Sequence, residues 1–293
     1  MGGGVAASVA AIARPADTAL LFPGQGSHDA NARGHVELHA PSLLERCVSL
    51  VGEDPFPRAG ESTRFAQPAI FLASLSRYWS APPAGDVIAF AGHSLGEITA
   101  LTAAGALTPE DALHVVVERG RLMGEAQAGG MVVVRTDADT AAELAAATGT
   151  VVANDNGPGQ VVLSGTERAI AGVKPLAQSR GIKARRLDVA GAFHSPLMRQ
   201  AARGLRGVLA DLPVHRPSAP VLCCATARPF HDVRAQLALA VTSPVRWREV
   251  LDVLDARGVR RFIDVGPGDV LSGLVRRTLP HAETVEVGDA LVA

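Results

Sequence analysis

The stretch DVIAFAGHSLGEITALTAAGAL, residues 86–107, constrains the fold of this chain more than any other part of the sequence. Its first six residues predict a buried strand, and the part from Glu97 onward has the small, apolar composition of a packed helix. Between them, Gly92 and Gly96 bracket Ser94 in the pattern G-x-S-x-G. Glycine permits the sharp turn by which a strand passes directly into a helix. A turn of this kind is typical of a parallel α/β sheet and raises its serine clear of the strand end.

Strand and helix patterns alternate along most of the chain, which predicts a parallel α/β sheet. The predicted strands are a short buried one within 18–27 that ends in a Gly-rich turn, and those at 86–91, 220–225 and 260–266. The predicted helices are 42–52, 67–79 with Pro68 near its start, 97–107, 109–126, 196–211 and 243–258.

The middle of the chain has a different order of elements. Residues 131–189 predict strand, helix, two strands, helix and strand, which is the βαββαβ order of a ferredoxin-like unit. We therefore expect residues 131–195 to form an inserted subdomain, and 16–130 with 196–293 to form one large α/β domain. Residues 1–15 are expected to be disordered, because small apolar termini are seldom fixed.

Composition excludes several classes of function. The chain has 293 residues, a net charge of −1 and an isoelectric point of about 6.8, which gives no argument for binding nucleic acid or a membrane surface. No apolar run reaches the roughly 20 residues of a membrane span. The first basic residue, Arg14, follows the apolar N-terminal run, so no signal peptide is expected. The chain has only three cysteines, which predicts a reducing, cytoplasmic setting. It contains neither a CxxC nor an HExxH motif, so no metal site is expected.

A serine nucleophile needs a base to take its proton. His93 is adjacent to Ser94, but neighbours on a sharp turn point apart, so we expect it to be structural. His194 in GAFHSPLM follows the inserted unit, where the chain returns to the main sheet. From spacing alone, His194 is one choice among nine histidines. The pattern around Ser94 is also compatible with a plain strand-to-helix turn that has no catalytic role.

Eight motifs occur in a fixed order: LFPGQGS, QPAIF, AGHSLGE, ERGRLM, NGPGQVVLSG, GAFHSPLM, SPVRW and DVGPGDVL. On these motifs the chain resembles the malonyl-CoA:acyl-carrier-protein transacylase family, from about residue 18 to near its end. That family includes stand-alone enzymes of fatty-acid synthesis and acyltransferases of polyketide synthases. The resemblance implies a hydrolase-like α/β domain with an inserted ferredoxin-like subdomain.

The resemblance also implies the catalytic roles. Ser94 matches the nucleophile that carries the acyl group, and His194 matches its general base. In this family a backbone carbonyl orients the histidine, and the matching position is about Ala240. The backbone N–H groups of Gln25 and Leu95 match the oxyanion hole, although Gln25 would serve equally as a turn residue.

The substrate residues follow in the same way. Arg119 matches the arginine that binds the free carboxylate of malonate, since a planar guanidinium fits a carboxylate with two hydrogen bonds. Arg121 lies two residues further on and points to another side of the helix. Gln67 and Asn156 match polar pocket positions, with a core or turn role as the alternative.

Phe193 and Gly191, which both precede His194, bear on the choice of acyl group. Phe193 is expected to crowd the α-carbon and to favour unsubstituted malonyl. Gly191 stands where relatives carry His or Tyr, which leaves this preference partly open.

We therefore predict a free-standing enzyme that moves a malonyl group from malonyl-CoA to the phosphopantetheine thiol of an acyl carrier protein, without metal or redox cofactor. Polyketide synthase modules acting in trans are possible partners, and no nucleic acid or membrane is expected. Three alternatives remain: the same chemistry with another acyl donor, a serine hydrolase that clears carrier proteins, and a non-catalytic carrier-binding module. Basic residues are candidates for guiding an acidic carrier, with ordinary solvated charges as the alternative: Lys183, Arg185, Arg186, Arg199, Arg203, Arg276 and Arg277.

Overall fold

The computed structural model describes residues 17–27, 32–82, 86–189 and 191–286. The N-terminal segment expected to be disordered lies outside the described residues.

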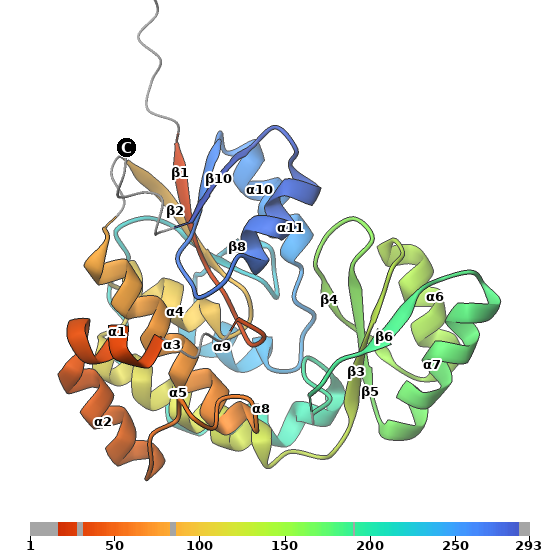
Figure 1. Cartoon of the computed structure of the whole chain (residues 1–293), viewed down its shortest axis with the longest axis horizontal. Coiled ribbons are helices and arrows are strands. Elements are labelled where there is room, and N and C mark those ends of the chain that lie inside the picture. Colours follow the sequence, from red (N-terminus) through yellow and green to blue (C-terminus); the bar gives the residue numbers. More distant parts are fainter. Residues whose placement is uncertain (1–16, 28–31, 83–85, 190, 287–293) are drawn as a thin grey trace, which may run out of the picture.

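A six-stranded sheet with the order β10-β9-β1-β2-β7-β8 forms the centre of the larger part (Figure 1). Its neighbours from β10 to β7 pair in parallel, and β8 pairs antiparallel with β7. This confirms the predicted parallel α/β sheet. The strands are β1 Thr18–Phe22, β2 Val87–Gly92, β7 Val221–Cys223, β8 Arg228–Pro229, β9 Arg261–Asp264 and β10 Glu283–Glu286.

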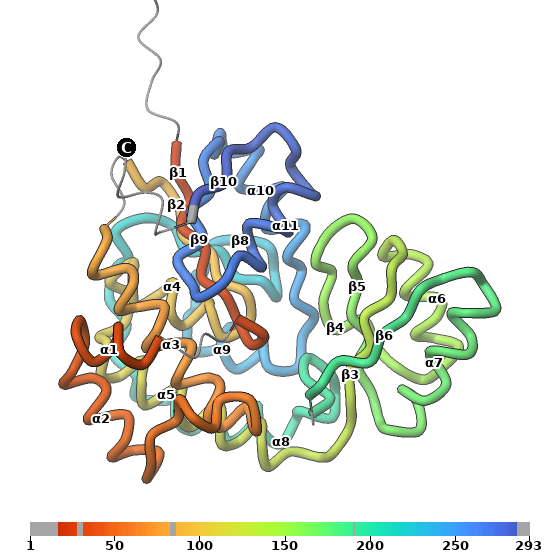
Figure 2. Tube along the Cα trace, viewed as in Figure 1, coloured from red at the N-terminus to blue at the C-terminus, as the bar shows by residue number. Residues whose placement is uncertain are grey.

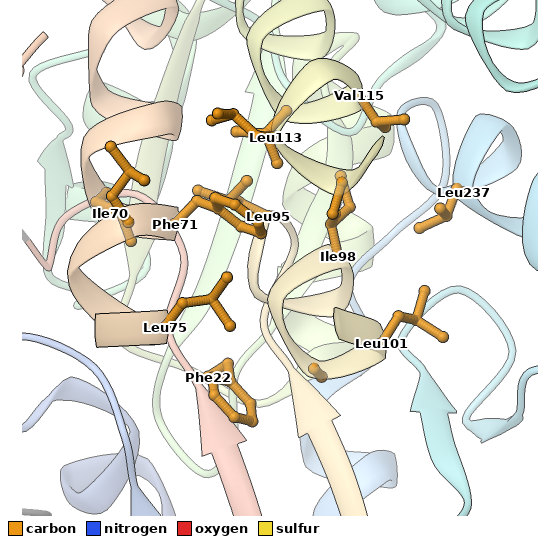
Figure 3. Close-up of a cluster of buried hydrophobic side chains, with 14 of the residues drawn as sticks. Phe22, Ile70, Phe71, Leu75, Leu95, Ile98, Leu101, Leu113, Val115 and Leu237 are labelled. Carbon is orange, nitrogen blue, oxygen red and sulfur yellow. The ribbon is translucent and has the colours of Figure 1, made fainter. Parts of the chain in front are cut away.

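Helices cover both faces of this sheet. Side chains of β1 alternate between the faces: Leu20 and Phe22 belong to one buried cluster, and Ala19 and Leu21 to another. Figure 3 shows part of the first cluster, in which Phe22 lies near Leu75 of α3 and other side chains come from α4 and α5. On the opposite face, Trp247 at the start of α10 is buried together with apolar side chains of α10 and α11. The helices are α1 Ala32–His39, α2 Pro41–Val51, α3 Thr63–Ser80, α4 Gly96–Ala103, α5 Pro109–Gly124, α8 Arg199–Leu209, α9 Val233–Ala240, α10 Trp247–Ala256 and α11 Val270–Thr278, with a 3₁₀ turn at Pro196–Met198.

A four-stranded antiparallel sheet with the order β4-β5-β3-β6 forms a smaller unit beside the large one (Figure 2). Its elements follow one another as strand, helix, strand, strand, helix and strand, so the predicted ferredoxin-like pattern is confirmed. Val132 and Val134 face the helices, whereas Met131 and Val133 face away from them toward the large unit. The elements are β3 Gly130–Val134, α6 Ala138–Thr148, β4 Val151–Asp155, β5 Val161–Gly165, α7 Glu167–Ser179 and β6 Ala184–Arg186.

The segment before α10 joins the two units. The Val245 N–H donates to the Ala153 carbonyl at 2.8 Å, and the Asp155 N–H donates to the Val245 carbonyl at 2.9 Å. Arg248 adds an ion pair with Asp155, Nε to Oδ2, at 2.9 Å. These bonds hold β4 against the large unit and so fix one wall of the space between the sheets.

Several elements differ from those predicted. Helix α3 begins at Thr63, where the Ser62 side chain accepts the Arg64 N–H, so the expected start at 67 is wrong. Pro68 therefore lies inside the helix and not near its start. The sequence patterns also do not indicate α1, α9, α11, β8 or β10. In the described part of the chain, no helix combines the length and apolarity that crossing a membrane requires.

Candidate active site

The turn between β2 and α4 holds Ser94 in the left-handed region, with φ of 55°. Its two glycines are required sterically. A Cβ on Gly92 would overlap the backbone of Gly96, and a Cβ on Gly96 would overlap the Phe22 carbonyl. The strand end and the helix start therefore touch, which keeps the Ser94 hydroxyl at the carboxyl edge of the sheet.

His194 faces Ser94 from across the pocket. Its Nε2 lies 2.8 Å from the Ser94 Oγ. Its Nδ1 lies 2.9 Å from the Ala240 carbonyl oxygen and 3.1 Å from that of Ser243. Because carbonyls only accept hydrogen bonds, Nδ1 carries the proton and Nε2 is left as the acceptor for the serine hydroxyl.

Burial keeps the His194 imidazole uncharged. It lowers the pKa of His194 to about 3, with further lowering by the positive charge of Arg119 and by His93. The imidazole is therefore neutral at any pH near 7, which is the state that a proton acceptor needs.

Arg119 reaches the nucleophile from α5 and is 4% exposed. Its Nη2 donates to the Ser94 Oγ at 3.1 Å, and its Nη1 donates to the Gln67 Oε1 at 2.6 Å. The Gln67 Nε2 in turn donates to the Thr63 Oγ1 at 2.8 Å. This chain of hydrogen bonds fixes the guanidinium beside the serine. Arg121 lies outside the site and pairs with Glu118 and Glu125, as its spacing from Arg119 predicts.

Glu97 lies in the first turn of α4 and is 1% exposed. Its Oε1 accepts the Cys224 N–H at 2.6 Å, which ties the first turn of α4 to the end of β7. Burial raises the pKa of Glu97 to about 7, and the Cys224 N–H and the charge of Arg119 oppose this rise. Burial also lowers the pKa of Arg119 to about 10, so the guanidinium stays charged at neutral pH. Neither Glu97 nor Ser243 is indicated by the sequence patterns, although Glu97 directly follows GHSLG.

His93 points away from Ser94, toward the small sheet. Its Nε2 lies 2.8 Å from the Asn156 Oδ1, and its ring packs edge-on against Trp247 with centroids 5.5 Å apart. This contact orients the Asn156 amide in the pocket wall, and His93 has the structural place expected for it.

The two backbone groups predicted to stabilise an oxyanion lie at the same pocket. Leu95 precedes α4, where backbone N–H groups have no partner within the helix. The loop that carries Gln25 packs directly on the turn, because a Cβ on Gly24 would lie 2.5 Å from the His93 carbonyl oxygen. Both residues thus line the pocket that contains Ser94.

A cavity of about 420 Å³ opens over Ser94 between the two sheets. Its wall from the small sheet includes the apolar side chains of Met131, Val133, Val162 and Leu187. Phe193 also lines it, and a Cβ on Gly191 would overlap the Phe193 ring. The glycine therefore allows the ring to fold back over residue 191.

Among the residues that the structure describes, no group of three or more His, Cys, Asp or Glu side chains is placed to hold a metal ion. The three cysteines are buried free thiols. What the site brings together is a hydroxyl, a neutral imidazole, a buried cation and helix-end N–H groups, which is an arrangement suited to acyl transfer through serine.

Comparisons with known proteins agree with this arrangement. The model of the acyl transferase domain family matches residues 46–291. The chain therefore belongs to the acyl transferase domain family.

Two curated relatives show how the match extends. The malonyl CoA-acyl carrier protein transacylase of Bacillus subtilis is 35% identical over 296 residues, covering 92% of this chain and 93% of the relative. The polyketide biosynthesis protein ThaF of Burkholderia thailandensis is 37% identical over 280 residues, covering 90% of this chain. This chain spans only 24% of the length of ThaF.

Solved structures are similar over nearly the whole chain. A malonyl-CoA:acyl carrier protein transacylase from Xanthomonas oryzae superposes with a TM-score of 0.87 at 31% identity, covering 95% of this chain and 97% of its own. A malonyl-transacylase in complex with a type II polyketide synthase acyl-carrier protein superposes with a TM-score of 0.86 at 28% identity, covering 94% and 98%.

Proposed function

We propose that this chain transfers a malonyl group from malonyl-CoA to the phosphopantetheine thiol of an acyl carrier protein. The family, the transacylase relatives and the structural similarity to a carrier-bound malonyl-transacylase support this activity. The observation that carries the choice of malonyl is the buried Arg119, whose Nη2 lies 3.1 Å from the Ser94 Oγ.

The position of Arg119 matches the shape of a malonyl ester. In such an ester, a single methylene separates the ester carbonyl from the free carboxylate. A guanidinium within hydrogen-bonding distance of Ser94 is therefore well placed to pair with that carboxylate. An acyl group without a carboxylate would leave the buried cation unpaired, which is costly.

In the first half of the reaction, His194 Nε2 takes the proton of Ser94 Oγ as the oxygen attacks the thioester carbonyl. The Gln25 and Leu95 N–H groups stabilise the negative oxygen of the tetrahedral intermediate. The carbonyls of Ala240 and Ser243 hold the imidazole in place and stabilise the positive charge that it gains. The thiolate of CoA then leaves with the proton from Nε2, and the malonyl ester of Ser94 remains.

The second half reverses these steps with a new thiol. The thiol of the carrier's phosphopantetheine gives its proton to His194 Nε2 and attacks the ester carbonyl. The intermediate collapses, the proton returns to Ser94 Oγ, and malonyl-carrier leaves. This chemistry uses the chain's own residues, and we propose that it needs no metal or redox cofactor.

Relatives named as malonyl CoA-acyl carrier protein transacylases, with and without a polyketide biosynthesis role in the name, are similar to this chain. We propose that its carrier belongs to fatty-acid or polyketide synthesis. We propose that the protein works in the cytoplasm, where acyl carriers and CoA thioesters meet, and that polyketide synthase modules are served in trans.

One experiment separates transfer from hydrolysis and identifies the donor. The protein is incubated with malonyl-, methylmalonyl- and acetyl-CoA, each with and without a holo-carrier protein, and the products are resolved by mass spectrometry. We expect malonyl-carrier as the main product, with little free malonate when the carrier is absent. Rapid release of free acid in both conditions would instead identify a hydrolase.

A further inference from the structure

Two arginines at the outer end of the pocket have no part in the chemistry described above. Arg135 and Arg185 line the same cavity as Ser94, and both are exposed. Neither forms an ion pair with any other residue that the structure describes. Asp188 also lines the cavity, but these two cations and Arg119 outnumber it.

The strand register places both arginines on the pocket face of the small sheet. Arg135 follows Met131 and Val133 at two-residue intervals, and the Arg135 N–H continues the ladder by donating to the Lys183 carbonyl at 2.9 Å. Arg185 on β6 pairs directly with Val133 on β3. Because side chains alternate along a strand, this face carries the apolar Met131 and Val133 and then Arg135, which lies about 13 Å along the strand from Met131 at 3.3 Å per residue.

A third cation strengthens the charge of this outer end. Arg277 on α11 donates through Nη2 to the Gln160 Oε1 at 3.0 Å, and Gln160 lines the cavity. Partial burial lowers the pKa of Arg277, and the positive charges of Arg135 and Arg276 lower it further. The rim thus holds positive charges that repel one another, and an anion bound between them would relieve this repulsion.

The two thiols of the proposed reaction are attached to the same kind of anion. CoA and the prosthetic group of a carrier both consist of an uncharged pantetheine arm that ends in a phosphate. A pocket wall that carries apolar side chains followed along the strand by exposed arginines fits an arm of this kind. We propose that Arg135 and Arg185 form a phosphate subsite that binds the 4′-phosphate common to CoA and to the carrier's phosphopantetheine. This inference rests on the proposed malonyl transfer and adds to it the group that anchors both substrates.

The neighbouring arginine on β6 provides a matched control. Arg186 faces the other side of the sheet, where both of its Nη atoms bond the Glu167 carboxylate, at 2.7 and 2.8 Å. Replacing Arg186 removes the same charge from the same strand without touching the pocket. Arg135→Gln, Arg185→Gln and the double variant are therefore compared with Arg186→Gln.

The donor test uses three malonyl thioesters that differ only beyond the arm: malonyl-CoA, malonyl-4′-phosphopantetheine and malonyl-pantetheine, which has no phosphate. We expect the double variant to lose about tenfold in kcat/KM of Ser94 acylation with both phosphorylated donors, as for a lost charge-assisted contact. With malonyl-pantetheine it should stay within about twofold of wild type. Equal losses with all three donors, or no loss with any, would overturn the subsite. A loss with malonyl-CoA alone would overturn it too, because the arginines would then bind the distal phosphates of CoA.

The acceptor test distinguishes the phosphate from the protein surface of the carrier. Holo-carrier and free 4′-phosphopantetheine should both become poorer acceptors in the double variant, and pantetheine should not. A loss confined to the holo-carrier would show that the arginines contact the carrier protein, against the proposal. Calorimetric binding of 4′-phosphopantetheine and pantetheine to the wild-type and variant proteins requires no turnover, so the subsite is tested separately from malonyl transfer. Equal affinity of wild type for the two compounds would refute it.

Discussion

Specific hydrogen bonds fix the orientation of the side chains that carry the chemistry. His194 has one nitrogen committed to two carbonyls, so the other is free for the serine. Arg119 is committed through Gln67 to one position beside Ser94. The selectivity and the pH dependence of the reaction should therefore respond to single substitutions.

Arg119→Ala should separate malonyl from acetyl. A hydrogen bond to a charged group contributes about 1.5–3 kcal/mol, so malonyl transfer should fall at least tenfold. Acetyl transfer should stay level or rise, because the acetyl group no longer meets an unpaired buried cation. Arg119→Lys should restore malonyl transfer only in part, since it supplies charge without the planar fork. The measurement is kcat/KM for both CoA esters, and an equal fall for the two would make Arg119 a structural residue.

The depressed pKa of His194 sets the acid side of the pH profile. A free imidazole with a pKa of 6.5 would lose basicity below that pH, whereas a pKa of about 3 keeps His194 neutral. Single-turnover acylation should therefore stay nearly flat from pH 6.5 to about 5.5. A tenfold fall for each pH unit below 6.5 would contradict this environment.

Glu97→Gln is the control for that profile. The pKa of Glu97 is raised to about 7, so Glu97 is neutral below and charged above that pH. An inflection near pH 7 that disappears in Glu97→Gln belongs to Glu97 and not to the base.

Gly191→Ala should alter the choice between malonyl and methylmalonyl. The new Cβ would overlap the Phe193 ring, which must then move within the pocket wall. A displaced ring takes volume from the acyl site, so kcat/KM for methylmalonyl-CoA should fall about tenfold more than that for malonyl-CoA. Gly191→Ala combined with Phe193→Leu should remove the difference. An unchanged ratio in the single variant would show that the ring does not border the α-carbon.

Among the elements, the turn between β2 and α4 tolerates the least change. Gly96→Ala places a methyl group against the Phe22 carbonyl, so it should lower the free energy of unfolding by about 1–3 kcal/mol or more. Gly207→Ala in α8 is the matched control, since no atom lies within 4 Å of its added Cβ. That change should stabilise the protein by about 0.4–1 kcal/mol. Denaturant unfolding measures both, and equal stability of the two variants would contradict the contact described here.

Local patterns predict those elements in which periodicity and end residues agree. The helix predicted at 109–126 corresponds to α5, whose start the Thr108 side chain caps, and the Asp137 side chain caps α6. Helix α3 was predicted to start too late, because Pro68 suggested a first turn while the Ser62 cap lies six residues earlier. Helix α11 was missed, since its cap is the Asp264 carboxylate, which accepts the Leu271 and Ser272 N–H groups from seven and eight residues away.

Among the site residues too, local sequence patterns indicate some, whereas others depend on contacts between distant segments. Ser94 is indicated by its own turn, but its partner His194 lies 100 residues away, and spacing alone did not single it out. The family resemblance named His194, Arg119 and Ala240. Glu97 and Ser243 were not indicated, because their contacts depend on which loops meet at the sheet edge. No local pattern encodes that meeting.

In the whole molecule, the pocket lies where the two sheets meet, and residues of both units line it. The large sheet supplies Ser94, and the small sheet supplies the apolar wall and its cationic end. The segment around Val245 joins them through hydrogen bonds to Ala153 and Asp155, two residues after the Ser243 carbonyl that holds His194. The nucleophile, its base and the substrate wall therefore depend on one another's placement.

The central claim is that Ser94 carries a malonyl group between two thiols, and intact-protein mass spectrometry tests it most directly. Wild-type protein incubated with malonyl-CoA should gain one malonyl mass, mapped by peptide analysis to Ser94, and should lose it when holo-carrier is added. Ser94→Ala should gain none, and His194→Ala should gain it about 10²–10⁴-fold more slowly. A Ser94→Ala protein that still takes up one malonyl group and passes it to the carrier would contradict the account.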